Sequence, residues 1–90
     1  MPKVALTVDD KAASRVQTLT NRLISAADNI LKERGYGKAE RKEQMKKIIH
    51  CEQTRLYNLY NGKRMLTAEE MYRIIFKLNM DDELLKDIVR

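Results

Sequence analysis

The sequence is poor in residues that break, cross-link or ligate. Among its 90 residues it has no tryptophan, one proline, three glycines, one histidine and one cysteine. A single cysteine, Cys51, excludes an intrachain disulfide, so we expect a reducing, cytoplasmic setting. His50 and Cys51 are the only histidine and cysteine, and two such ligands do not make a zinc site. We therefore expect neither a metal nor a cofactor.

Other absences argue against a membrane protein and against an enzyme. No apolar run approaches the ~20 residues that span a bilayer, and the apolar stretch within residues 1–10 is too short for a signal peptide. The sequence contains no glycine-rich phosphate loop, no recognisable nucleophile and no carboxylate pair outside expected helix starts. A chain that is 43% hydrophobic and 34% charged is typical of a small soluble helical domain.

Charge is present, and it is unevenly placed. Of the formal net charge of +5, residues 35–66 carry eight basic and three acidic side chains, whereas residues 67–90 carry four basic and six acidic ones. One basic face is therefore expected. A polyanion is the partner that such a face favours.

The spacing of apolar residues predicts an all-α fold, a single domain built as a bundle of four to five helices. A first helix of about 20–24 residues is expected to follow Asp9 or Asp10 and to end near Arg34, with Gly35 as its stop. Further helices are expected at residues 38–49 and 52–61, after Thr67, and after Asp81 or Asp82. Thr67 and Glu70 have the spacing of a capping box.

The predicted core follows the same spacing. The expected inward residues are Val16, Leu19, Leu23, Ala26 or Ala27, Ile30, Met45, Ile48, Ile49, Leu56, Leu59, Met71, Ile74, Ile75, Leu78, Leu84, Leu85 and Ile88. Cys51 occupies an apolar slot, so we expect a small core residue there. Tyr60 is expected to pack with its hydroxyl in water.

Residues 1–9 show a different pattern. Val4, Leu6 and Val8 alternate with other residues, which indicates a short strand or an extended arm. Pairing of two such arms would give a ribbon-helix-helix protein, with Lys3, Ala5 and Thr7 toward the DNA groove. The expected length of the first helix argues against that architecture.

Residues 38–64 combine an apolar inner side with a polar, basic exterior. Apolar residues at 45, 49, 51, 56 and 59 allow two short helices to pack at a steep angle across a tight turn. The second of these helices then presents polar side chains at its start and ends in Asn-Gly-Lys-Arg. A polar front with a basic exit predicts a helix that enters a DNA groove.

This segment, with Gln-Thr-Arg-Leu-x-x-Leu-Tyr-Asn-Gly-Lys-Arg at residues 53–64, resembles the lambda-repressor-like helix-turn-helix family of phage repressors, Cro proteins and their bacterial relatives. The resemblance covers roughly residues 40–80. It implies a helix-turn-helix with its exit loop at residues 38–64. The recognition helix would occupy about residues 52–61 and lie in the major groove.

The resemblance also implies roles for individual residues. Base contacts are implied for Gln53, Thr54, Arg55 and Asn58, since glutamine can pair with adenine and arginine with guanine. Backbone contacts are expected for Lys42, Lys46, Lys47, Asn61, Lys63 and Arg64. The function implied is a sequence-specific double-stranded DNA-binding transcriptional regulator. Because one such helix contacts few base pairs, we expect a homodimer on two half-sites.

Two residues depart from the family pattern. The family usually has a small residue where Lys46 stands, at the close approach of the two helices, and glycine where His50 stands, in the turn. We therefore expect the head of Lys46 to turn outward and His50 to adopt a left-handed backbone. An alternative function is a helical protein-interaction module, such as an adaptor, an antitoxin or a polymerase-binding regulator, that uses the same fold to hold a protein partner.

Overall fold

Five α-helices make up residues 8–89, the part of the chain that the computed structural model describes, with side chains placed from Lys11 to Val89. They are α1 (Val8–Glu33), α2 (Lys38–Ile49), α3 (Gln53–Tyr60), α4 (Ala68–Lys77) and α5 (Asp82–Val89). No strand occurs among residues 8–89. The expected all-α fold of four to five helices is confirmed.

The first helix is longer than its apolar spacing predicts. It has 26 residues and so spans about 39 Å. It begins at Val8, so the last two residues of the expected arm at residues 1–9 belong to α1, and residues 1–7 lie outside the described part of the chain. Neither proline nor glycine occurs between Lys3 and Arg34, so no helix-breaking residue opposes this extension.

Four helices end at a residue with a left-handed backbone: Gly35 (φ 96°), His50 (φ 63°), Gly62 (φ 73°) and Asn79 (φ 50°). After each of them, the next backbone N–H donates to the carbonyl five residues earlier, as from Tyr36 to Leu31 and from Lys63 to Asn58. These bonds satisfy carbonyl groups that a helix end leaves without partners. The left-handed conformation expected of His50 is confirmed.

Side chains cap the starts of α4 and α5. The Thr67 hydroxyl accepts a hydrogen bond from the backbone N–H of Glu70 (3.1 Å), and the Glu70 carboxylate accepts one from the backbone N–H of Thr67 (2.8 Å). This is the predicted capping box. At α5, the Asp81 carboxylate accepts from the backbone N–H of Leu84 (2.8 Å), which makes Asp81 the cap.

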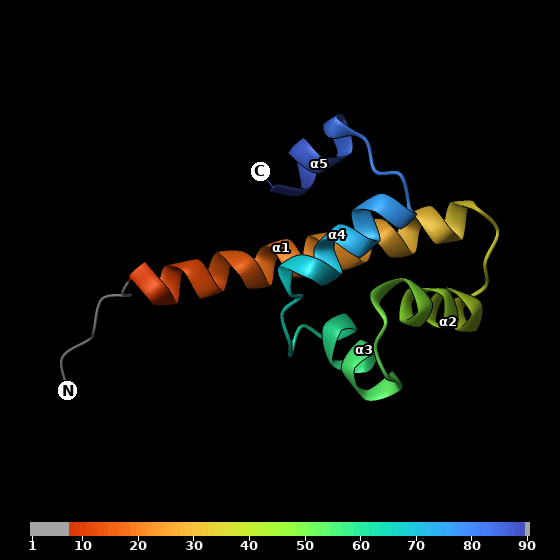
Figure 1. Ribbon diagram of the computed structural model, residues 1–90, viewed down its shortest axis with the longest axis horizontal. Coiled ribbons are helices and arrows are strands. Elements are labelled where there is room, and N and C mark those ends of the chain that lie inside the picture. Colours follow the sequence, from red (N-terminus) through yellow and green to blue (C-terminus); the bar gives the residue numbers. More distant parts are fainter. Residues whose placement is uncertain (1–7, 90) are drawn as a thin grey trace.

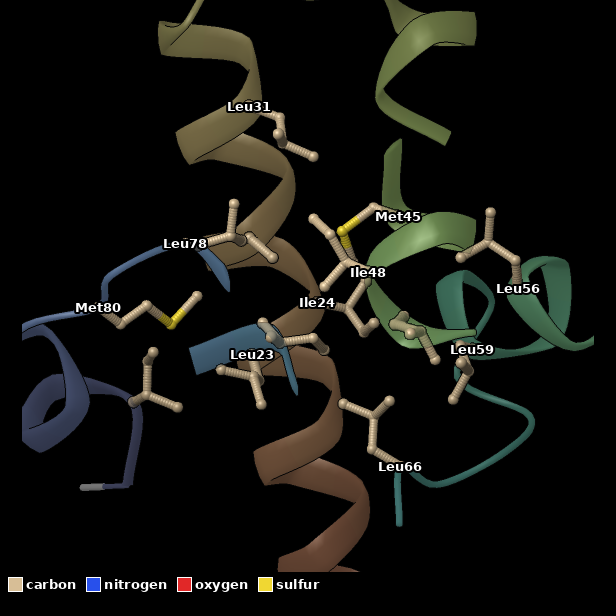
Figure 2. Packing of buried hydrophobic residues seen from close by; sticks show 14 residues of the cluster. Leu23, Ile24, Leu31, Met45, Ile48, Leu56, Leu59, Leu66, Leu78 and Met80 are labelled. Carbon is tan, nitrogen blue, oxygen red and sulfur yellow. The ribbon is translucent and has the colours of Figure 1, made fainter. Parts of the chain in front are cut away.

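The core lies around the middle of α1, which runs the length of the molecule. In the view of Figure 1, α2 and α3 lie below α1 and α5 lies above it, while α4 packs against α2. Ile24 of α1 lies beside Met45 and Ile48 of α2 and Leu59 of α3, whereas Leu23 lies on the side of α1 nearer Met80 (Figure 2). All the other helices therefore share one core with α1.

Most of the predicted core is confirmed. Of the expected inward residues, those that are buried are Leu23, Ala27, Met45, Ile48, Ile49, Leu56, Leu59, Ile74, Leu78 and Ile88, and Cys51 packs against them. Val16 differs, because its side chain is 36% exposed. The apolar stripe of α1 thus continues beyond the region that the other helices cover.

We expect His50→Gly to raise the free energy of unfolding by about 0.5–1 kcal/mol. Histidine is exposed here and holds a φ of 63°, a conformation that costs an L-residue energy but glycine little. Thermal and denaturant unfolding measure the change. Gly35→Ala is the reverse control, since nothing lies within 4 Å of an added Cβ there, and it should cost about 1 kcal/mol. A loss of stability in His50→Gly would contradict the expectation.

Candidate nucleic-acid interface

The short connection between α2 and α3, residues 50–52, accommodates both departures from the family pattern. His50 provides the left-handed residue. The ammonium group of Lys46 leaves the helix crossing and donates to Gln53 Oε1 (3.1 Å), and it pairs with Glu43 (2.8 Å). The expected outward turn of Lys46 is confirmed. This contact also ties the start of α3 to the last turn of α2.

The start of α3 presents its polar side chains to solvent. Gln53 and Thr54 are exposed, and Tyr57 on the next turn is 60% exposed. Leu56 and Leu59 on the opposite side are buried. Asn58 is half-buried. A helix fixed by an apolar back and open at its N-terminal end has the form needed to enter a groove.

Arg55 is engaged within the protein. Its guanidinium donates from Nε and Nη2 to both carboxylate oxygens of Glu70, at 2.8 and 2.5 Å, and from Nη2 to the carbonyl of Met65 (3.1 Å). The Glu70 residue is only 6% exposed. A fork that is already bidentate on a carboxylate cannot make the same pair with guanine. The geometry therefore suits Arg55 to positioning α3 and the loop after it, in place of the base contact expected from sequence.

The exit loop, residues 61–67, is anchored from two helices. The backbone N–H of Leu66 donates to the buried Thr20 hydroxyl of α1 (3.0 Å), and the Gln17 side chain donates to the carbonyl of Arg64 (3.2 Å). Arg55 holds the carbonyl of Met65 from α3. The side chains of Lys63 and Arg64 are exposed. Hydrogen bonds thus hold the backbone at Arg64, Met65 and Leu66. Lys63 directly precedes this held segment.

The other residues expected to contact the DNA backbone differ in their exposure. Lys47 and Asn61 are exposed. Lys42 is half-buried, with its ammonium 5.6 Å from the centre of the Tyr60 ring, an attractive cation–π geometry. Lys46 is held as described above. Lys47, Asn61, Lys63 and Arg64 are therefore the more accessible of the residues expected to bind phosphate.

The Tyr60 hydroxyl has a partner within the protein that the sequence did not predict. It donates to Asp28 Oδ1 of α1 (2.9 Å), and the same oxygen pairs with Arg41 of α2 (3.2 Å). Burial raises the pKa of this hydroxyl, and the hydrogen bond to Asp28 raises it further. Tyr60 packs against the core and is half-buried, as expected. The bond to Asp28 could not be predicted, because Asp28 is 32 positions away in sequence and comes beside Tyr60 only when α1 and α3 pack.

Sequence reasoning did not find the residues that hold the loop. Gln17 and Thr20 lie on α1, and neither belongs to a local motif that involves the loop. Glu70 was identified only as a helix cap, and the bidentate geometry with Arg55 shows its second role.

Two further classes of site find no support among residues 8–89. Among the side chains described, those of residues 11–89, no group of three or more histidine, cysteine, aspartate or glutamate residues could hold a metal ion. None of the five described helices is long and apolar enough to cross a membrane.

Burial raises the pKa of the Cys51 thiol, and the negative charge of Glu70 adds to this, so the thiol stays protonated near neutral pH.

Comparison with known proteins identifies no relative of this chain. No protein-family model, curated protein or solved structure matches the chain significantly.

Proposed function

We propose that the chain is a sequence-specific double-stranded DNA-binding regulator of transcription that acts in the cytoplasm. In this proposal α2 and α3 form a helix-turn-helix, and α3 enters the major groove. The observation that carries it is the anchored exit loop, which holds the exposed Lys63 and Arg64 directly after a helix whose polar start is also exposed. Backbone contacts of that kind set register, and the helix start reads bases.

Within this proposal the residues have different roles. Gln53, Thr54 and Asn58 are the base-contacting residues. The Gln53 carbonyl oxygen already accepts from Lys46, which orients its amide –NH₂ group as a donor toward a base acceptor. Lys47, Asn61, Lys63 and Arg64 contact phosphates, with Lys42 and Lys46 beside them. Arg55 positions the recognition helix through Glu70.

Selection of bound sequences from a random duplex pool tests this function. We expect one preferred site, and an affinity whose logarithm falls linearly with the logarithm of salt concentration, with a slope of about −0.9 per phosphate neutralised. Gln53→Ala should weaken binding to the selected site about tenfold and leave random DNA unaffected.

Asn29→Ala removes an amide that is also exposed, but on α1, and serves as the control, with no effect expected on either DNA. Equal losses on selected and random DNA in Gln53→Ala would contradict base reading. Absence of DNA binding at low salt would contradict the function itself.

One observation favours the alternative, a protein-interaction module. Tyr72 and Phe76 of α4 stack with ring centres 5.8 Å apart, and their residues are 61% and 69% exposed. Exposed aromatic pairs are enriched at protein interfaces. If DNA binding is absent, Tyr72→Ala and Phe76→Ala are the variants with which to test loss of a protein partner.

A further inference from the structure

Residues of α1 and α5 line a groove, and α5 lies on the side of α1 away from α3 (Figure 1). We call it the α1–α5 groove. Its volume is about 200 Å³, and its lining includes Arg15, Val16, Leu19, Arg22, Ile88 and Val89. Most of its exposed surface is apolar. Val16 is 36% exposed and Val89 is 61% exposed. The groove therefore offers apolar surface to a partner.

The apolar lining is continuous with the core. Ala12, Val16, Leu19, Leu23, Ala26 and Ile30 follow one another at alternating spacings of four and three along α1, the repeat that buries one stripe of a helix against a partner. Leu23 is 2% exposed and packs within the domain. The stripe N-terminal to it carries the same pattern. Leu19 packs partly against the core, and α5 lies beside Val16 and Leu19 in the groove, whereas Ala12 is exposed.

The N-terminal end of α1 extends past the rest of the molecule (Figure 1). Every residue from Lys11 to Val16 is exposed. Helices gain most of their stability by packing an apolar side, and an exposed extension of this length gains little by itself. A partner that covers Ala12, Val16 and Leu19 would supply the missing packing.

Charge identifies a partner for this surface. Residues 11–22 of α1 contain no carboxylate and carry the exposed Lys11 and Arg15. Arg22 is engaged within its own copy, where it donates to the carbonyl of Ile88. In contrast, α5 carries Asp82, Glu83 and Asp87 against Lys86. The basic stretch of one copy and the acidic helix of another attract each other. In a two-fold arrangement each surface meets the other surface twice. A second copy of this chain thus matches the groove in both polarity and charge.

We propose that two copies associate through the α1–α5 groove, with residues 11–22 of each copy packing across α1 and α5 of the other. The arrangement leaves α3 uncovered, because α3 and α5 lie on opposite sides of α1 (Figure 1). The inference rests on the groove and its charges, and it holds whether or not the protein binds DNA. With DNA bound, the same pairing would present two recognition helices to two half-sites.

Sedimentation equilibrium of the full chain without DNA tests the proposal. The wild-type protein should dimerise reversibly, more weakly as salt rises. Val16→Asp combined with Val89→Asp should raise the dissociation constant at least about tenfold, because it places carboxylates in the apolar lining. Both side chains are exposed in the single copy, so circular dichroism should show an unchanged helical fold.

Phe76→Asp is the matched control, since Phe76 is even more exposed than Val89 but lies on α4. It should leave the dissociation constant unchanged. A wild-type chain that stays monomeric at every concentration would overturn the proposal, as would a dimer that survives the double variant. A dimer broken by Phe76→Asp alone would place the interface on α4 and overturn it as well. If the double variant unfolds, Arg15→Glu replaces it, since Arg15 is exposed on α1. This variant should weaken association, and an unchanged dissociation constant would overturn the proposal.

Discussion

Glu70→Ala is expected to lower the free energy of unfolding by about 2–3 kcal/mol, a large effect for one side chain on a small domain. The substitution removes both bonds to the Arg55 guanidinium and the reciprocal bond to the backbone N–H of Thr67. It leaves Arg55 without its ionic partner. Because the Arg55 side chain is 33% exposed, water recovers part of the loss, and we expect the cost to stay below that of a fully buried pair. Urea denaturation measures it.

Glu69→Ala is the matched control. Glu69 is the adjacent glutamate and pairs with Arg73, but its side chain is 76% exposed, so its loss should cost no more than about 0.5 kcal/mol. A double-mutant cycle of Arg55→Ala with Glu70→Ala should show a coupling above about 1 kcal/mol. Similar costs for the two glutamates would argue against Arg55 as a positioning residue.

The same pair predicts a pH dependence. Hydrogen bonding from Arg55 lowers the pKa of Glu70 and outweighs the opposing effect of burial. A carboxylate with a depressed pKa in the folded state stabilises that state above its unfolded pKa, about 4.3 for glutamate. This contribution is lost as pH falls through the folded pKa. The stability difference between wild type and Glu70→Ala should therefore shrink below about pH 4.

Lys63→Ala combined with Arg64→Ala is expected to weaken binding to all duplex DNA, on the order of 10- to 100-fold at low salt. Each side chain is exposed on the anchored exit loop, where it would neutralise one phosphate. The slope of log affinity against log salt should fall in magnitude by about 2. Sequence preference should persist, because Gln53, Thr54 and Asn58 remain.

Lys77→Ala combined with Lys86→Ala removes the same charge from exposed positions on α4 and α5. That control should change affinity little. If both pairs weaken binding equally, the effect is one of net charge, and the exit loop is not the contact. If neither pair matters while DNA still binds, another surface of the protein carries the interaction.

Local signals in the sequence were enough for the helices and much of the core. The periodic apolar residues of α2 and α3, the capping box at Thr67 and the stops at Gly35 and Gly62 each depend on neighbours within a few positions. Such signals survive in a linear pattern because helices are built from short-range bonds. The start of α1 was less predictable, because the helix begins at Val8, before the two aspartates that were expected to precede it.

The tertiary structure decided which side chains of residues 53–64 are exposed and which are bound within the protein. The sequence by itself determined an all-α chain with a polar, basic segment at residues 53–64. Packing alone brought Glu70 to Arg55, Asp28 to Tyr60 and Thr20 to the exit loop. These pairs join residues 15 to 46 positions apart, and no local pattern records which distant group will satisfy a given donor. Arg55, expected from sequence to contact a base, is bound to Glu70 and to the carbonyl of Met65, whereas Lys63 and Arg64 are exposed.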